Sequence, residues 1–216
     1  MTPPNINPID LMINLTLKGD KDIDEHLLTL FALTLSMKPA LIIELGVRTA
    51  RSTLPFLVGA DPVNAKVVSV DINEVRPDFN FPEPLKERWE FIQKDALKFL
   101  EDDFPKLRES QNMEEKERGD IIYIDDWHAG DHVRRELELI SDLVTPKDLI
   151  ILHDLMYGNS QPNYRSVENP SDKQWGNGGP YKPISELDLS IWEYMTIPRC
   201  HGLTLLRKKA DEVYTS

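Results

Sequence analysis

Four short apolar runs, each with an acidic residue at or near its end, constrain what this chain can fold into more than any other feature of its sequence. They occupy residues 41–46, 66–71, 120–125 and 148–154. Polar and apolar residues hardly alternate within them, which is typical of strands buried on both faces of a sheet. A weaker strand is predicted at 89–92. The sequence therefore predicts a sheet that lies inside the molecule.

Stretches with helical periodicity separate these strands. Apolar residues recur at helical spacing in 22–38, and further helices are predicted in the segment up to Gly59, at 95–104 and at 131–144. Strands that alternate with helices imply parallel pairing and right-handed crossovers. The predicted fold class is therefore α/β, a doubly wound, Rossmann-like and mostly parallel sheet with helices on both faces.

The strand ends carry the residues that we expect to bind a ligand. In an open parallel sheet of this kind, ligands bind outside the carboxyl ends of the strands. Residues from four different strands are thereby expected to share one edge: Glu44, Gly46, Asp71, Asp125 and Asp154.

The charge of the chain argues against a nucleic-acid partner. It has 37 acidic and 25 basic side chains, a formal net charge of -12 and no clustered basic stripe. Phosphate backbones are bound by Lys and Arg, so a small or cationic partner fits better. No apolar run approaches the roughly 18 residues that a membrane-spanning helix needs. The single Cys200 and the absence of a secretion signal after Met1 predict a cytoplasmic protein.

We expect one packed domain with peripheral segments around it. Prolines near the start predict an irregular N-terminal arm, and polar or proline-rich stretches predict surface insertions without a core of their own. A long segment rich in Gly, Pro, Asn and Ser predicts a lid-like loop. The ranges are 1–21 for the arm, 22–209 for the domain, 74–87 and 109–119 for the insertions, 155–183 for the loop and 210–216 for the tail.

A single glycine turn and a later acid suggest the kind of ligand. Only Gly46 of a dinucleotide-type glycine pattern is present, so a pyrophosphate at this turn is disfavoured. Asp71 follows 25 residues later, at a strand end where a carboxylate can accept both hydroxyls of a ribose. Together they favour a nucleoside without a pyrophosphate. The alternatives are that Gly46 only ends a strand and that Asp71 only caps a helix.

Several short motifs together resemble the class I S-adenosylmethionine-dependent methyltransferases. The resemblance is greatest to small O-methyltransferases of the catechol O-methyltransferase type and to a related bacterial branch, and it extends over about residues 24–208. It implies a seven-stranded sheet whose last strand, at 202–207, runs antiparallel. The motifs are IELGV at 43–47, ST at 52–53, VD at 70–71, DA at 95–96, IDDWH at 124–128 and LHD at 152–154.

The resemblance also implies roles for individual residues. Glu44 and Gly46 match the motif that meets the methionine part of the cofactor, and Ser52 matches the serine that holds its carboxylate. Asp71 matches the ribose-binding acid. The remaining matches are Asp95 and Ala96 beside the adenine, Asp125 near both the cofactor and a divalent metal, and Asp154 as a second metal ligand.

Two departures from the family pattern bear on the metal and on the turn. Ala50 stands where a second glycine is common, and Leu155 stands where the catechol type has a third metal ligand, Asn. Mg²⁺ keeps several waters and needs few protein ligands. His128, Asp126, His153 or water are the candidates to complete a shell around Asp125 and Asp154.

The predicted function is methyl transfer from S-adenosylmethionine to a small molecule, at oxygen rather than nitrogen. Asp125 and His128 are the candidate catalytic residues, since a His beside a strand-end acid can act as a base. Tyr164 and Trp175, with Tyr181, are candidate substrate contacts on the lid-like loop. Acceptor and oligomeric state are left open by the sequence.

Two other functions compete with this prediction. A metal-dependent hydrolase would use the cluster formed by Asp125, Asp126, His128, His153 and Asp154, but it would leave Gly46 and Asp71 without a task. A non-catalytic binding protein would keep the fold, with or without the cofactor, and contact a partner through its acidic surface; the missing Asn after Asp154 is compatible with this alternative.

Overall fold

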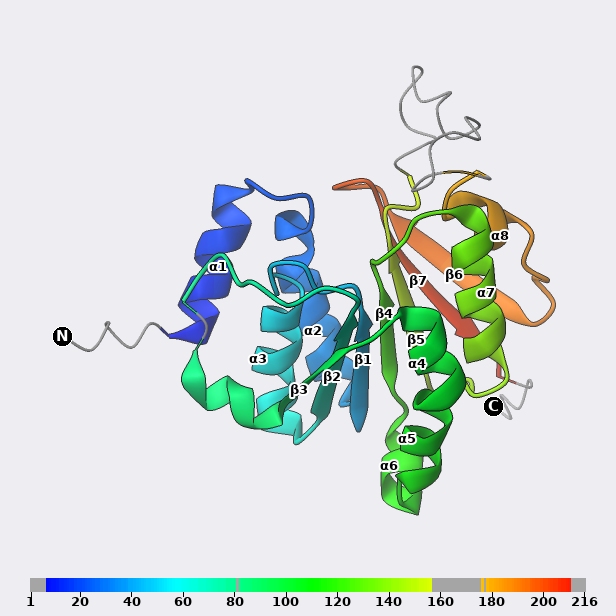
Figure 1. Cartoon of the computed structure of the whole chain (residues 1–216), viewed down its shortest axis with the longest axis horizontal. Coiled ribbons are helices and arrows are strands. Elements are labelled where there is room, and N and C mark those ends of the chain that lie inside the picture. Colours follow the sequence, from blue (N-terminus) through cyan, green and yellow to red (C-terminus); the bar gives the residue numbers. More distant parts are fainter. Residues whose placement is uncertain (1–6, 81, 157–175, 177, 211–216) are drawn as a thin grey trace, which may run out of the picture.

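A computed structural model of the protein describes residues 7–80, 82–156, 176 and 178–210. Its centre is a seven-stranded sheet with the strand order β3-β2-β1-β4-β5-β7-β6 (Figure 1). β1 to β5 pair in parallel, whereas β7 runs antiparallel to both β5 and β6. The fold class and the antiparallel last strand are thus confirmed. The strands are β1 (Leu41–Leu45), β2 (Lys66–Asp71), β3 (Trp89–Gln93), β4 (Ile121–Ile124), β5 (Leu149–His153), β6 (Trp192–Ile197) and β7 (Leu203–Lys208).

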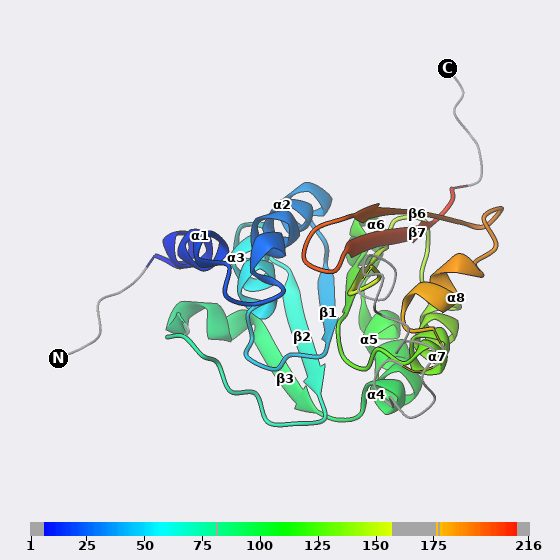
Figure 2. The same cartoon turned by 90° about the horizontal axis from the view of Figure 1, so that it is seen from above.

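Helices cover both faces of the sheet (Figures 1 and 2). One face carries α1 (Pro8–Lys18), α2 (Leu27–Met37) and α3 (Thr53–Val63). The opposite face carries α4 (Ala96–Asp102), α5 (Phe104–Ser110), α7 (Gly130–Ser141) and α8 (Tyr181–Ser185). The remaining helical elements are α6 (Met113–Arg118) and the 3₁₀ helices η1 (Asp24–His26) and η2 (Glu83–Arg88).

The central strands are buried on both faces, as their composition predicts. Successive side chains of a strand point to opposite faces. Ile42 therefore packs in the core under α1 to α3, whereas Ile43 packs in the core under α4, α5 and α7. Every residue of β1, β4 and β5 is buried. These strands form the rigid layer from which the functional edge extends.

The strand order places a switch point at the carboxyl end of β1. The chain crosses from β1 to β2 on one side, and β4 pairs with β1 on the other side. Backbone bonds extend the pairing past the strand ends, from Gly46 N to Val70 O at 2.9 Å and from Asp125 N to Leu45 O at 2.8 Å. A crevice for ligands opens at such a switch point.

The irregular N-terminal arm is a wrong prediction for the described part of that segment. Residues 8–18 form α1, because Pro8 stands in the first turn, where proline is tolerated, and the Asn7 side chain accepts a hydrogen bond from the backbone N–H of Ile9. Met12 and Leu15 are buried in the same core as α2 and α3.

The insertion at 109–119 contains α6, which begins at a capping box made by Asn112 and Glu115 and has no buried residue, as expected for a surface insertion without a core of its own. One further expectation needs correction. The lid-like loop ends earlier than expected because α8 begins at Tyr181, directly after Pro180 with its φ of -63°. No helix within the described ranges is long and apolar enough to span a membrane.

The burial of α1 can be tested by truncating its core side chain. Met12 is 0% exposed, so Met12→Ala should lower the free energy of unfolding by about 2–5 kcal/mol. Leu17→Ala on the same helix is the control, because Leu17 is 80% exposed and its loss should cost less than about 0.5 kcal/mol. Urea unfolding measures both; similar costs for the two variants would show that α1 does not dock.

Candidate active site

The site begins at the turn after β1, where only glycine fits. Gly46 has a φ of +86°, which side chains disfavour. A Cβ at this position would lie 2.3 Å from the backbone oxygen of Asp125. The absence of a side chain thus lets the end of β1 lie directly against the end of β4.

Asp71 at the end of β2 holds this turn in place. Its Oδ2 accepts hydrogen bonds from the backbone N–H groups of Val47 at 2.9 Å and Arg48 at 3.1 Å, and its Oδ1 accepts one from Asn73 at 2.8 Å. A carboxylate has about four acceptor positions, so Asp71 can bind further donors. The residue expected to bind ribose therefore also shapes the glycine turn.

A cavity of about 440 Å³ lies along the carboxyl ends of β1, β2 and β4. Its volume is within the range of about 300–1,000 Å³ that is usual for small-molecule sites. Its wall includes the apolar side chains of Ile72 and Trp127, which are 65% and 43% exposed. Five residues that the sequence analysis expects at the cofactor also line it: Gly46, Asp71, Asp95, Ala96 and Asp125.

Ile72 and Trp127 are two of the cavity residues that the sequence analysis did not assign. Both stand beside predicted site residues, because Ile72 follows Asp71 and Trp127 lies within the IDDWH motif. Exposed apolar side chains at a cavity offer a surface for a flat ring. Asp95 has a second role there, since its side chain caps α4 by accepting a hydrogen bond from Lys98 N at 3.1 Å.

Glu44 lies beneath the turn and not on the cavity wall. Its carboxylate is 0% exposed and accepts hydrogen bonds from Ser52 at 2.6 Å, Thr53 at 2.7 Å and Ser69 at 2.5 Å. Burial raises the pKa of Glu44 to about 7, although these hydroxyls oppose the shift. Glu44 thereby joins the start of α3 to β1 and β2.

Ser52 lines a second, smaller cavity of about 40 Å³ together with Gly46, Val47 and Asp125. Ile23 and Asp22, from the segment before η1, close its other side. This cavity and the larger one share Gly46 and Asp125, so together they follow the carboxyl end of β1.

A buried ion-pair network supports the small cavity. The guanidinium of Arg51, whose side chain is 6% exposed, lies 2.8 Å from Asp24 and 3.0 Å from Asp78. It connects the segment before α2, the start of α3 and the proline-rich segment 74–87. Nothing in the local sequence indicated this connection, because its members are far apart along the chain.

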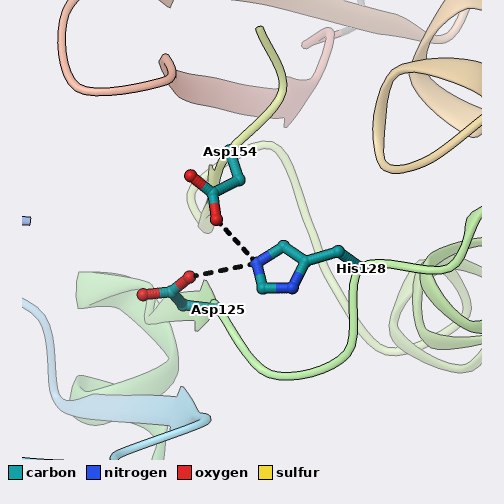
Figure 3. Close-up of side chains that lie close together, drawn as sticks. All are labelled: Asp125, His128 and Asp154. Atoms are coloured by element: carbon teal, nitrogen blue, oxygen red, sulfur yellow. Dashed lines mark ion pairs between the residues drawn. The ribbon is translucent and has the colours of Figure 1, made fainter. Parts of the chain in front are cut away.

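Asp125, His128 and Asp154 converge at the ends of β4 and β5. Figure 3 shows the imidazole of His128 pointing at both carboxylates, with Nε2 2.8 Å from Asp154 Oδ2 and 3.5 Å from Asp125 Oδ1. His153, 1% exposed, places Nδ1 3.1 Å from Asp154 Oδ1 and 3.3 Å from Asp125 Oδ1. His201 from the turn between β6 and β7 lies 3.3 Å from Asp154 Oδ1.

These charges determine which groups carry protons. Burial opposes a charged His128, but Asp125 and Asp154 outweigh it and raise the pKa of His128 to about 9. Burial would raise the pKa of Asp154, but His128 and His153 lower it well below the usual range. At neutral pH the cluster therefore holds an imidazolium between two carboxylates, and His128 in this state cannot accept a further proton.

The same donor set fits a divalent cation. One ligand atom each from Asp125, His128 and Asp154 lies within 4.8 Å of the others. Two carboxylates and an imidazole are suitable ligands for such an ion. Leu155 is buried in the core and supplies no donor. The structure brings Asp125, Asp154 and His128 together at one edge, and it adds His201, which the sequence analysis did not assign to the site.

Two predicted substrate contacts lie outside the described residues. They are Tyr164 and Trp175, which fall in the undescribed part of the lid-like loop. Tyr181 is described, and it begins α8 with a 46% exposed side chain.

Comparison with protein families shows to which family the chain belongs. Residues 21–197 match the family model described as rhamnosyl O-methyltransferase/CmcI. The chain belongs to this O-methyltransferase family. The family assignment confirms the prediction of an S-adenosylmethionine-dependent O-methyltransferase that was made from the sequence. No curated protein sequence matches the chain.

Solved structures of methyltransferases share the fold. SAH-bound PaMTH1 from Podospora anserina has a TM-score of 0.60 and 17% identity, covering 95% of this chain and 89% of its own. The O-methyltransferase TomG from Streptomyces achromogenes, involved in tomaymycin synthesis and solved with SAM, has a TM-score of 0.60 and 14% identity, covering 97% and 100%. A Bacillus cereus O-methyltransferase in complex with SAH has a TM-score of 0.58 and 14% identity, covering 97% and 94%.

The glycine turn can be tested by adding one methyl group. Gly46→Ala should destabilise the protein and abolish cofactor binding, because the new Cβ would collide with the Asp125 backbone. Gly19→Ala is the matched control: Gly19 also has a positive φ, +58°, but its nearest neighbouring atom would be 3.8 Å away. Gly19→Ala should cost only about 1–2 kcal/mol for the backbone conformation. Equal unfolding free energies for the two variants would contradict the close approach.

Proposed function

We propose that this O-methyltransferase holds S-adenosylmethionine along the carboxyl ends of β1, β2 and β4 and methylates a hydroxyl of a small molecule beside Asp125, His128 and Asp154. One observation carries the proposal: a single cavity runs from Asp71 to Asp125 across the glycine turn. Asp71, the proposed ribose ligand, and the acidic cluster of Asp125, His128 and Asp154 are therefore at two ends of one site.

The larger cavity fits the adenosine half of the cofactor. The carboxylate of Asp71 is available to the ribose hydroxyls, and Asp95 and Ala96 lie where the adenine edge would reach the start of α4. Ile72 and Trp127 offer apolar surface to the faces of the ring. Aromatic and apolar side chains suit such a flat ring.

The smaller cavity lies where the methionine half would extend from the adenosine cavity. Ser52 and the backbone of the turn can donate hydrogen bonds to the cofactor carboxylate, and Asp22 and Ile23 close the opposite side. The sulfonium, which carries a positive charge, would then lie near Asp125. The carboxylates at this edge favour a cation.

Methyl transfer requires an aligned and unprotonated acceptor. The methyl group leaves the sulfonium sulfur and bonds to the acceptor oxygen, while the hydroxyl proton leaves to a base or to solvent. The enzyme contributes chiefly by holding donor and acceptor in line. At this edge Asp125 and Asp154 can orient the acceptor hydroxyl, and the imidazolium of His128 can stabilise an acceptor oxygen that has lost its proton.

A divalent cation would be held by Asp125, Asp154 and His128. When bound, it would lower the pKa of a hydroxyl that contacts it. The three side chains would then orient the acceptor through the ion instead of directly. Leu155 is buried in the core and would supply no ligand, whereas His201, 3.3 Å from Asp154 Oδ1, is a further candidate ligand.

The acceptor that we propose is a hydroxylated small molecule. The family description contains a rhamnosyl O-methyltransferase. Compounds with sugar hydroxyls and compounds with phenolic hydroxyls are therefore the two classes of acceptor to assay. Adjacent hydroxyl groups in either class would suit a site with two carboxylates.

Calorimetry tests the cofactor site. S-Adenosylmethionine and its demethylated product should both bind the wild type, and Asp71→Asn should weaken binding by roughly 10- to 100-fold, as expected for the loss of a charged hydrogen-bonding partner worth about 1.5–3 kcal/mol. Asp61→Asn is the control, since Asp61 pairs with Arg88 and its side chain is 65% exposed. Unchanged affinity in Asp71→Asn would remove the proposed ribose site. Binding without turnover on either class of acceptor would favour a binding protein.

Removal of metal tests whether methyl transfer depends on a divalent cation at Asp125, Asp154 and His128. Turnover should stop in excess chelator and return with added Mg²⁺, whereas cofactor binding should persist. Asp154→Asn should abolish turnover and leave cofactor binding intact, because Asp154 belongs to the acidic cluster and lies outside the adenosine cavity. Undiminished turnover in chelator would eliminate the metal-assisted mechanism.

A further inference from the structure

A second cluster of metal-type ligands lies beside the cofactor cavity, apart from the Asp125–His128–Asp154 site. Asp126 follows the end of β4, whereas His132 and Glu136 both belong to α7. Residues four apart on a helix lie on the same face, one turn from each other. Nε2 of His132 is 3.0 Å from Asp126 Oδ2 and 3.7 Å from Glu136 Oε1.

The buried carboxylate of Glu136 is the strongest indication of a bound ligand. Its side chain is 0% exposed, and neither of its carboxylate oxygens has a hydrogen-bond partner within the described part of the chain. Oδ1 of Asp126 is also buried and has no hydrogen-bond partner among the described residues. A buried carboxylate without hydrogen bonds is costly, so such groups are normally paired or bind a metal. Among the described residues, the positive group that pairs with Glu136 is His132, whose Nε2 lies 3.7 Å from Glu136 Oε1.

The spacing of the three ligand atoms suits one bound ion. Zinc lies about 2.0–2.2 Å from nitrogen and oxygen ligands, so neighbouring ligand atoms in a tetrahedral or octahedral shell are about 2.9–3.5 Å apart. The distances from His132 Nε2 to its two carboxylate neighbours, 3.0 and 3.7 Å, are close to this range. All three ligand atoms lie within 4.8 Å of one another.

The position gives an ion a route of entry and an open coordination site. Asp126 and His132 line the 440 Å³ cavity, and the side chain of each is 17% exposed. Glu136 lies behind them, away from solvent. Three protein ligands with a fourth position facing a cavity are the usual arrangement of an open zinc site.

We propose that Asp126, His132 and Glu136 bind a divalent cation, Zn²⁺ or a similar ion, on the wall of the cofactor cavity. One imidazole and two carboxylates suit Zn²⁺ better than Mg²⁺, which prefers oxygen ligands alone. The ion neutralises the buried carboxylates and fixes the first turns of α7 to the end of β4. Because Trp127 and His128 lie between Asp126 and His132 in the sequence, the ion also fixes the segment that lines the cavity and carries His128.

The rival arrangement is compensation by protons. Burial opposes a charged His132, but Asp126 and Glu136 raise its pKa to about 10, while burial and then Asp126 raise the pKa of Glu136 well above its usual value. An imidazolium beside a neutral carboxyl group would balance the charge without a metal. Metal binding would displace these protons, so the two arrangements exclude each other at any one moment.

Zinc content distinguishes them. The full-length wild type, Glu136→Gln and Glu138→Gln are dialysed against the same buffer containing Zn²⁺, and bound zinc per chain is measured by mass spectrometry. We expect Glu136→Gln to hold one zinc ion fewer than the wild type. Glu138→Gln, on the same helix but 56% exposed, should match the wild type. Equal zinc content in all three proteins would overturn the proposal.

A second variant guards against loss of folding. Asp126→Asn changes a ligand at the cavity wall rather than in the core, and it should lose the same ion. Thermal unfolding in the Asp154→Asn background gives an independent readout, because the first cluster is disabled there. Zn²⁺ should raise the Tm of Asp154→Asn, but not that of the double variants Asp154→Asn/Glu136→Gln and Asp154→Asn/Asp126→Asn. If Asp126→Asn keeps the full zinc content, the proposal is contradicted. Failure here would leave cofactor binding and the Asp154 site untouched, so it is distinguishable from failure of the proposed function.

Discussion

The contact between the end of β1 and the end of β4 is the constraint on which the site depends. Gly46 allows it, because a Cβ there would lie 2.3 Å from the Asp125 backbone oxygen. Asp71 then fixes the turn from the β2 side through the N–H groups of Val47 and Arg48. Glu44, beneath the turn, fixes it through hydrogen bonds from Ser52 and Thr53 at the start of α3. Cofactor cavity and acidic cluster share this one piece of backbone.

Several buried acids lie at the same edge, whereas Asp120 and Asp148 are buried at the other end of β4 and β5 and pair with Arg108. Most of the acidic excess of this chain is solvated, but Glu44, Asp154 and Glu136 are buried and must each be compensated locally. Hydroxyls compensate Glu44, imidazoles compensate Asp154, and the proposed ion would compensate Glu136. A site built in this way favours cationic ligands, which is the charge of a sulfonium and of a divalent metal. The net charge alone could not distinguish these acids from the solvated ones.

The sequence predicted the parts of the site that local patterns encode. Strands buried on both faces have uninterrupted apolar runs, and the acids that end them necessarily share an edge, so Asp71, Asp125 and Asp154 could be placed without a structure. Contacts between distant segments were not predictable. His201 reaches Asp154 only because β7 pairs with β5, and Arg51 meets Asp78 only once α3 and the 74–87 segment have packed. The edge strand β6 escaped prediction because its half-exposed residues lack a continuous apolar run.

A crystal structure with S-adenosylhomocysteine and Mn²⁺, recorded with the anomalous signal of manganese, tests this account most directly. It should show the ribose hydroxyls on Asp71, the adenine between Ile72 and Trp127, and a manganese peak between Asp125 and Asp154. A cofactor bound away from the glycine turn, or a full-occupancy cofactor with no manganese at that pair of carboxylates, would contradict it.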